Sequence, residues 1–280
     1  MRLRTSMAII IAAAVVTLGL VARQPGILGS APVMKHVSDT SNRPENLPDG
    51  GSTPVLVELF TSEGCSSCPP AEALLLRLGR TQPVRGADVI VLEEHVDYWD
   101  HLGWKDPFSS ESATDRQVEY GEAFGGRQAY TPQMIVDGSA EFVGSSESEA
   151  LRAIRTASQS PKPAVQLSWG TGDMLTIQIN PQANADRGDP ADVYLVVAEN
   201  MLHSDVKRGE NAGRALEHDG VTRLFQPLGN IKTVSSGFSS TVAVRPAGEW
   251  NRANLRAVVF VQDRHSHRVW AAEAIPFAAA

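Results

Sequence analysis

The cysteines are the residues of this chain whose type and spacing are best suited to chemistry. The 280-residue sequence contains two, Cys65 and Cys68, separated by two serines. Two thiols at this spacing can interconvert between a dithiol and a disulfide. They can also form an inert local disulfide or supply two of the four ligands of a structural metal site. A metal site of that kind lacks a second cysteine pair here, and a bridge that closes so short a loop stabilises little. Redox chemistry is therefore the leading interpretation.

The segments that flank the pair place it between a strand and a helix. Residues 54–60 form a short apolar run that is typical of a buried strand. Pro69 and Pro70 open a leucine-rich stretch, residues 71–78, which we expect to be a helix because proline is tolerated in a first helical turn. Cys65 is therefore expected at or just before the helix N-terminus, where the helix dipole and free N–H groups stabilise a thiolate.

This placement predicts different roles for the two thiols. Cys65, expected to be the more exposed, is the predicted nucleophile, with a pKa below the usual value of about 8.5. Cys68, expected one turn into the helix, is the predicted resolving cysteine. Ser66 and Ser67 are predicted to donate hydrogen bonds to the thiolate, and the alternative is that they only cap the helix.

Two further polar residues bear on the same site. Glu63 lies close before Cys65, and a nearby carboxylate raises the pKa of a thiol, although we expect Glu63 to be exposed and screened. His95 follows a second apolar run, residues 87–92, at the carboxyl end of a predicted parallel sheet, where sites commonly form. His95 is predicted to stabilise a thiolate or to bind a ligand. The alternative is a histidine that only hydrogen-bonds its aromatic loop.

The N-terminus has the pattern of an export signal. Arg2 and Arg4 precede residues 7–21, an uncharged and mainly apolar stretch that is short for a membrane span of about 20 residues. Residues 1–31 are predicted to be a signal peptide, with an uncleaved membrane anchor as the alternative. Residues 32–52, rich in Ser, Asn, Asp, Pro and Gly, are predicted to be a flexible tether. Both alternatives place the folded part outside the cytoplasm, periplasmic or secreted, where a disulfide persists.

Residues 53–160 alternate between strand and helix patterns. After the second strand we expect a loop over 95–104, a helix over 110–124, a hairpin over 130–143 and a helix over 147–157. The order β-α-β-α-β-β-α, with the dithiol after the first strand, resembles the thioredoxin-like fold.

The resemblance to thioredoxins implies roles for three more residues. Thr131 and Pro132 fall where that family has a cis-proline loop that docks the substrate backbone beside the nucleophilic sulfur. The alternative is a proline that only starts an edge strand. Glu58 corresponds, with one extra loop residue, to the buried acid beneath the resolving cysteine, where it would accept the Cys68 proton. The alternative is that Glu58 faces solvent.

Four motifs connect the chain to a more specific family. They are VELFTSEGCSSCPPAE at residues 57–72, HVDYWD at 95–100, YTPQ at 130–133 and RGENAGR at 208–214. Together they resemble the DUF1223 family, exported bacterial proteins with a thioredoxin-like domain and no assigned activity. The resemblance covers most of the chain after the tether. It implies that the loop 207–214 is either a partner or ligand surface facing the dithiol, or simply a long hairpin loop.

The pattern changes after Pro161-Lys162-Pro163. Residues 161–280 show short alternating strands without a strong amphipathic helix, which is typical of a β-sandwich. The expected strands are 164–169, 174–179, 193–199, 241–244, 255–262 and 269–274. The predicted fold is therefore an α/β thioredoxin-like domain followed by a mainly-β, sandwich-like C-terminal domain.

These observations favour an exported thiol–disulfide oxidoreductase. Its Cys65–Cys68 pair would exchange with protein or small-molecule disulfides and with a redox partner protein, using no cofactor and no metal ligand. A net charge of −7 gives no basic footprint for nucleic acid. Two alternatives remain: a soft-metal protein that binds Cu(I) through the cysteines and His95, and a non-catalytic binding module with a structural disulfide.

Overall fold

The computed structural model describes residues 51–181, 190–232 and 236–277. The predicted signal or anchor, residues 1–31, and most of the predicted tether, residues 32–50, lie outside the described residues. The helices are α1 (Pro69–Thr81), α2 (Glu111–Ala123) and α3 (Glu147–Ser158), with short 3-10 helices η1 (Asp100–Leu102) and η3 (Arg252–Asn254). The strands are β1 (Thr53–Thr61), β2 (Ala87–His95), β3 (Gln133–Val136), β4 (Ala140–Val143), β5 (Val165–Trp169), β6 (Met174–Ile179), β7 (Ala191–Glu199), β8 (Leu202–Asp205), β9 (Ala215–His218), β10 (Val221–Ile231), β11 (Phe238–Ala243), β12 (Leu255–Asp263) and β13 (Val269–Pro276).

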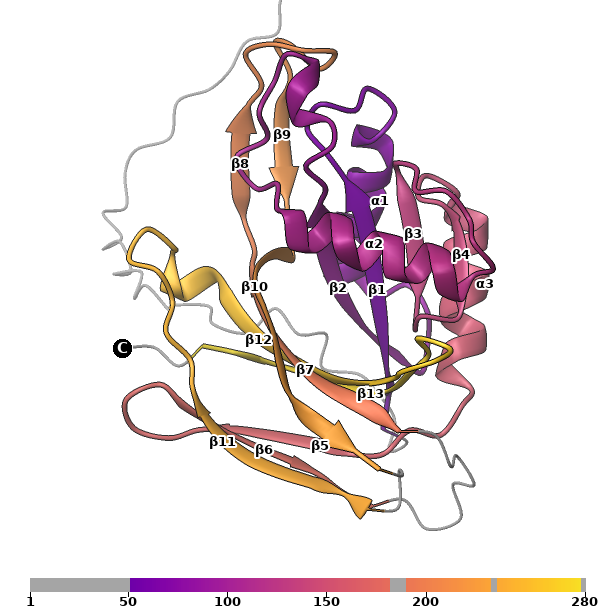
Figure 1. Ribbon diagram of the computed structural model, residues 1–280, viewed down its shortest axis with the longest axis vertical. Helices are drawn as coiled ribbons and strands as arrows, with labels where there is room; N and C mark the ends of the chain where they lie inside the picture. Colours follow the sequence, from indigo (N-terminus) through magenta and orange to yellow (C-terminus); the bar gives the residue numbers. More distant parts are fainter. Residues whose placement is uncertain (1–50, 182–189, 233–235, 278–280) are drawn as a thin grey trace, which may run out of the picture. The chain divides into compact units, whose positions relative to one another are not determined.

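A single mixed sheet of eight strands forms the centre of the described chain (Figure 1). Its order is β13-β12-β7-β10-β2-β1-β3-β4, so strands from both halves of the sequence lie in it. β1 and β2 are parallel and joined through α1, whereas β3 and β4 form an antiparallel hairpin beside β1. β10 joins the two halves, because it pairs with β7 over most of its length and with β2 at Val221.

The two faces of β1 carry different layers, since successive side chains of a strand point to opposite sides. Val55, Val57 and Leu59 pack in one core with α1 and α3. Phe60 packs on the other side, against Tyr120 of α2. The dithiol loop after β1 therefore begins on a strand that is buried on both faces.

A smaller antiparallel sheet, in the order β11-β6-β5, forms a second layer. Its inward residues Leu175, Ile177 and Ile179 share a core with residues of β7, β12 and β13. The C-terminal half is thus two packed β layers, and one of them belongs to the central sheet.

The structure agrees with the expected class at a coarse level, a mixed α/β protein that consists mainly of strands around a large central sheet. The six strands expected after residue 160 are present, although β11 begins earlier than expected. β8, β9 and β10 were not expected. The division into domains at 53–160 and 161–280 stays a prediction. Because strands of both segments share one sheet, the test is whether the two segments unfold together.

Candidate functional site

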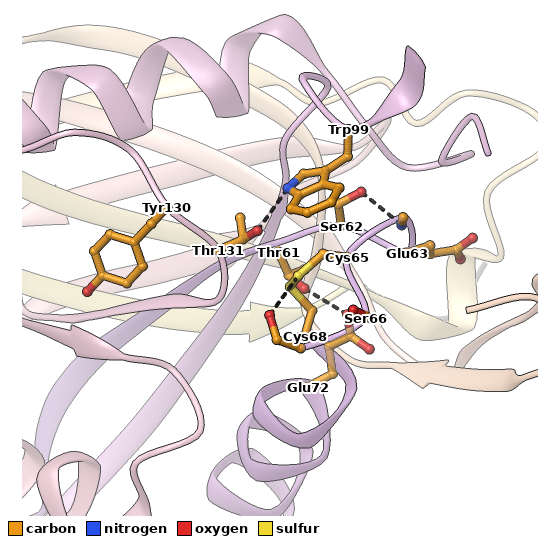
Figure 2. Close-up of a disulfide and its surroundings, with 12 residues drawn as sticks. Thr61, Ser62, Glu63, Cys65, Ser66, Cys68, Glu72, Trp99, Tyr130 and Thr131 are labelled. Atoms are coloured by element: carbon orange, nitrogen blue, oxygen red, sulfur yellow. Dashed lines mark hydrogen bonds between the residues drawn. A yellow bond between two sulfur atoms is a disulfide. The ribbon is translucent and has the colours of Figure 1, made fainter. Parts of the chain in front are cut away.

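The structure places the two cysteines at the junction between β1 and α1. They form a disulfide with a Cα–Cα distance of 5.5 Å. The backbone N–H of Cys68 donates to the Cys65 carbonyl at 3.2 Å, so the segment forms a tight turn before the helix. Figure 2 shows the bridge above the first turn of α1, with Thr61 and Glu72 beside it.

Two expectations about the thiols are wrong. Both cysteines are fully buried, so Cys65 is not the more exposed of the pair. Cys68 is the N-cap of α1 rather than a residue one turn inside it, because Pro69 and Pro70 occupy the first helical positions. Its carbonyl accepts the first helical hydrogen bonds, from the backbone N–H of Ala71 and of Glu72. The two prolines also remove two of the free N–H groups expected near the dithiol.

The two serines between the cysteines are exposed and differ in their contacts. The Ser67 hydroxyl lies 3.3 Å from the Cys65 sulfur, a contact that would let it donate a hydrogen bond to a Cys65 thiolate. Ser66 instead uses its backbone N–H, which donates to the Glu210 carboxylate at 3.1 Å. Ser67 is therefore the serine placed to act on the sulfur.

Trp99 links the dithiol loop to the segment that enters β3. Its Nε1 donates to the Thr131 hydroxyl at 2.9 Å, and its Cβ would lie 3.2 Å from a Cβ added at Gly64, next to Cys65. The Thr131–Pro132 bond is cis, as expected. Thr131 is half-buried and Pro132 is buried. The docking of substrate by these two residues stays a prediction.

The loop between β8 and β9 covers the dithiol loop from the other side. The side-chain amide of Asn211 donates to the carbonyls of Glu63 and Cys65, at 2.9 and 2.8 Å. The carboxylate of the preceding residue, Glu210, accepts a hydrogen bond from the Ser66 backbone N–H. Residues 207–214 belong to the loop of the β8–β9 hairpin, with Gly209 and Gly213 at positive φ, and this loop faces the dithiol segment. Its use as a partner or ligand surface stays a prediction.

Glu58 lies on the face of β1 that packs on α2. Its carboxylate accepts hydrogen bonds from Arg116 Nε at 2.6 Å and from the Tyr120 hydroxyl at 2.5 Å, and it is fully buried. Val57 and Leu59 on either side point toward α1. The alternative that Glu58 faces solvent is therefore wrong. Its carboxylate also points away from α1, the helix whose N-cap is Cys68. Its role as proton acceptor stays a prediction that the placement does not favour.

Glu72 is the buried acid on the α1 side, and the sequence motifs did not single it out. It lies one helical turn after Cys68 and is 3 % exposed, and its Oε1 accepts a hydrogen bond from the Thr61 hydroxyl at 2.7 Å (Figure 2). Burial, followed by the nearby charge of Glu93, raises the pKa of Glu72 from 4.5 to about 7. The i, i+4 spacing from Cys68 on a helix is a signal that could have identified it.

His95 is buried in a network of charged residues behind the dithiol loop. Its Nδ1 lies 2.7 Å from Asp106 Oδ2, and its Nε2 lies 3.5 Å from Glu93 Oε1. Its ring makes edge contacts with Phe108 and His218. Burial opposes the charged ring, but the carboxylates of Asp106 and Glu93 outweigh it and hold the pKa of His95 well above its usual value.

Glu63 belongs to the same network, which corrects the expectation that it is exposed. It is fully buried, and its carboxylate accepts hydrogen bonds from Trp104 Nε1, at 2.7 Å, and from the Ser204 hydroxyl. Its Oε1 lies 3.4 Å from His218 Nε2. His218 and Ser204 come from β9 and β8, strands that the sequence pattern did not predict, so their part in the site could not be found from sequence.

Comparison with protein families gives one match. The family model described as "Protein of unknown function (DUF1223)" matches residues 56–262. No curated protein matches the chain. Within the part of the chain that the structure describes, no helix is long and apolar enough to cross a membrane.

Two solved structures resemble the fold over most of its length. A crystal structure of a protein from Agrobacterium tumefaciens is 25% identical and matches with a TM-score of 0.66, covering 82% of this chain and 97% of that chain. HBP35 of Porphyromonas gingivalis is 13% identical and matches with a TM-score of 0.57, covering 81% of this chain and 76% of its own. The second likeness concerns the fold alone.

Proposed function

The chain belongs to the DUF1223 family, whose function is unknown. We propose that it is an exported thiol–disulfide oxidoreductase. One observation carries the proposal: the chain's two cysteines form a disulfide between β1 and the proline-started N-terminus of α1. We assign residues 53–160 to a thioredoxin-like module, on the support of the parallel β1-α1-β2 unit followed by the β3-β4 hairpin and α3. Export is proposed from the N-terminal sequence pattern.

The proposed reaction is a reversible two-electron exchange. The Cys65 thiolate attacks one sulfur of a substrate disulfide, forms a mixed disulfide and releases the first substrate thiolate. The Cys68 thiolate then attacks the Cys65 sulfur, forms the Cys65–Cys68 disulfide and releases the second. The dithiol is oxidised by two electrons and the substrate disulfide is reduced to two thiols. A partner dithiol returns the two electrons, and the reverse sequence oxidises substrate thiols.

Neighbouring residues support the separate steps. The Ser67 hydroxyl, 3.3 Å from the Cys65 sulfur, can donate to the attacking or leaving thiolate. Glu72, rather than Glu58, lies on the helix that carries Cys68, and its pKa of about 7 suits it to accept the Cys68 proton. Thr131 and Pro132 form the proposed docking edge for the substrate backbone. Both cysteines are buried, so a protein substrate requires an opening beside them, which we assign to the loop at Asn211 that contacts the Cys65 carbonyl.

A single set of variants tests the proposal. The exchange of a dithiol with insulin or oxidised glutathione is expected to be abolished in Cys65→Ser. Cys68→Ser is expected to accumulate a mixed disulfide, because the resolving thiol is missing. Ser148→Ala, an exposed substitution on α3, serves as the control and should retain the wild-type rate. Exchange by Cys65→Ser at the wild-type rate would refute the proposal.

A non-catalytic module with a structural disulfide is the second candidate, and the full burial of both cysteines favours it. The two candidates differ in reduction potential, measured in a redox buffer by alkylation of the released thiols. Structural disulfides typically have potentials below about −300 mV. A value well above that level supports the oxidoreductase. A value below it, together with no exchange by the wild-type protein, supports the module.

A further inference from the structure

A compact group of metal-ligating side chains lies behind the dithiol loop. Glu93 and His95 are the last residues of β2 on one face, and His218 ends β9. All three are at most 2 % exposed, and one potential ligand atom from each lies within 4.8 Å of the others. None of the steps proposed for the dithiol uses them.

Each histidine turns one nitrogen toward Glu93 and the other toward a further carboxylate. His95 Nδ1 is paired with Asp106 at 2.7 Å, and His218 Nε2 lies 3.4 Å from Glu63 Oε1. His95 Nε2 is buried and makes no hydrogen bond among the described residues, with Glu93 Oε1 3.5 Å away. Buried polar atoms are nearly always satisfied, so this nitrogen indicates that a partner is missing. A metal-bound histidine usually pairs its other nitrogen with a carboxylate, as His95 does with Asp106.

The spacing of the three ligand atoms fits one ion. Zinc–nitrogen and zinc–oxygen bonds of about 2.0–2.1 Å place neighbouring ligand atoms about 3.3 Å apart. Glu93 Oε1 lies 3.5 Å from His95 Nε2 and 2.9 Å from His218 Nδ1. Glu63 faces the opposite nitrogen of the His218 ring, so it orients that ring from outside the ligand set.

We propose that Glu93, His95 and His218 bind one divalent transition-metal ion, with Zn²⁺ as the best match. Two imidazoles and one carboxylate are a ligand set that Zn²⁺ accepts, with the fourth position left to a water molecule. The ion replaces protons that the carboxylates otherwise hold on the two rings. It joins the end of β2 to the end of β9 behind the dithiol loop.

This site is independent of the proposed redox function, and the experiment separates the two. The full chain is produced in medium supplemented with Zn²⁺ or Co²⁺, dialysed against a chelator and analysed for bound metal by mass spectrometry. We expect one ion per chain, and the Co²⁺ form should show the visible absorption of a tetrahedral site. The Cys65→Ser/Cys68→Ser variant should bind the same amount, because no sulfur belongs to the site.

Two ligand variants and a matched control complete the test. His95→Gln and His218→Gln should lose the bound ion, whereas His265→Gln, at an exposed turn, should keep it. If the two ligand variants do not fold, the wild-type Co²⁺ spectrum and the cysteine variant decide the question. Wild-type protein without bound metal would show a metal-free ion network and overturn the proposal. Loss of the metal in the cysteine variant would also overturn it, because thiolates would then hold the ion.

Discussion

Glu72 and Glu58 show how position on an element decides the chemistry of a carboxylate near the dithiol. Both are buried acids within a few residues of the cysteines in sequence. Glu58 forms a buried ion pair with Arg116, on the face of β1 opposite α1. Glu72 accepts a hydrogen bond from the Thr61 hydroxyl and forms no salt bridge among the described residues, and burial together with the charge of Glu93 favours its protonated form. Glu72 is therefore the acid on the dithiol helix whose pKa, about 7, suits it to exchange a proton near neutral pH.

The raised pKa of Glu72 predicts a pH-dependent loss of stability. Below pH 4.5 the carboxyl is protonated in both the folded and the unfolded chain, and it contributes nothing. As the pH rises from 4.5 to about 7, the unfolded chain releases the proton and the folded chain keeps it, so stability falls. Above pH 7 the carboxyl is ionised in both states, and the free energy of unfolding is lower than at pH 4 by on the order of 3 kcal/mol. Glu72→Gln should therefore be more stable than the wild type at pH 8 by up to that amount, and equal to it at pH 4.

Urea unfolding of the oxidised protein at the two pH values measures this difference. Glu119→Gln is the control, because Glu119 is exposed on α2 and should change stability little at either pH. If Glu72→Gln shifts the midpoint equally at pH 4 and pH 8, Glu72 does not titrate with a raised pKa.

Local sequence signals predicted the elements around the dithiol because those signals are strong there. The apolar run before Cys65 and the prolines after Cys68 fix a strand end and a helix start. β10 was missed because Pro227 and Gly229 interrupt its pattern. The structure accommodates them with irregularities in the pairing to β7, one of which falls between Pro227 and Gly229. Since β9 and β10 are consecutive, the same failure hid the placement of His218, whereas the family motif at 208–214 did point to the loop at Asn211.

The covering loop between β8 and β9 predicts a protected disulfide. Asn211 is fully buried and donates two hydrogen bonds to the dithiol segment, so Asn211→Ala leaves the carbonyls of Glu63 and Cys65 without this partner. The expected loss of stability is about 1–3 kcal/mol. We expect the loop also to limit access to the sulfurs, so reduction of the Cys65–Cys68 bond by dithiothreitol should become severalfold faster. Stopped-flow alkylation of the released thiols measures the rate.

Lys207→Ala is the matched control for this loop. The Lys207 ammonium pairs with Asp205, away from the dithiol, so its removal should leave the reduction rate unchanged. An unchanged rate in Asn211→Ala would mean that this loop does not control access to the disulfide.

At the scale of the whole molecule, the two sequence halves share one core. Leu56, Ile90 and Leu92 of the first half pack with Val258 and Phe260 of the second. Arg116 adds a polar link between the halves, because it pairs with Glu58 of β1, donates to Gln262 of β12 at 3.1 Å and lies over the ring of Phe260. The change of pattern after residue 160 predicted a domain boundary. Because periodicity reports only local structure, it could not reveal that both halves contribute strands to the same sheet.

Phe260→Ala tests whether this shared core makes the molecule unfold as one unit. Phe260 is fully buried, and its truncation is expected to cost about 3–5 kcal/mol. If folding is cooperative, the urea midpoint measured by far-ultraviolet circular dichroism and the midpoint measured by reducibility of the distant Cys65–Cys68 bond should coincide, and both should fall. Met201→Ala, at a side chain that is 72 % exposed, should leave both midpoints nearly unchanged. Two separate transitions, with the dithiol region insensitive to Phe260→Ala, would instead show that residues 53–160 fold as an independent domain.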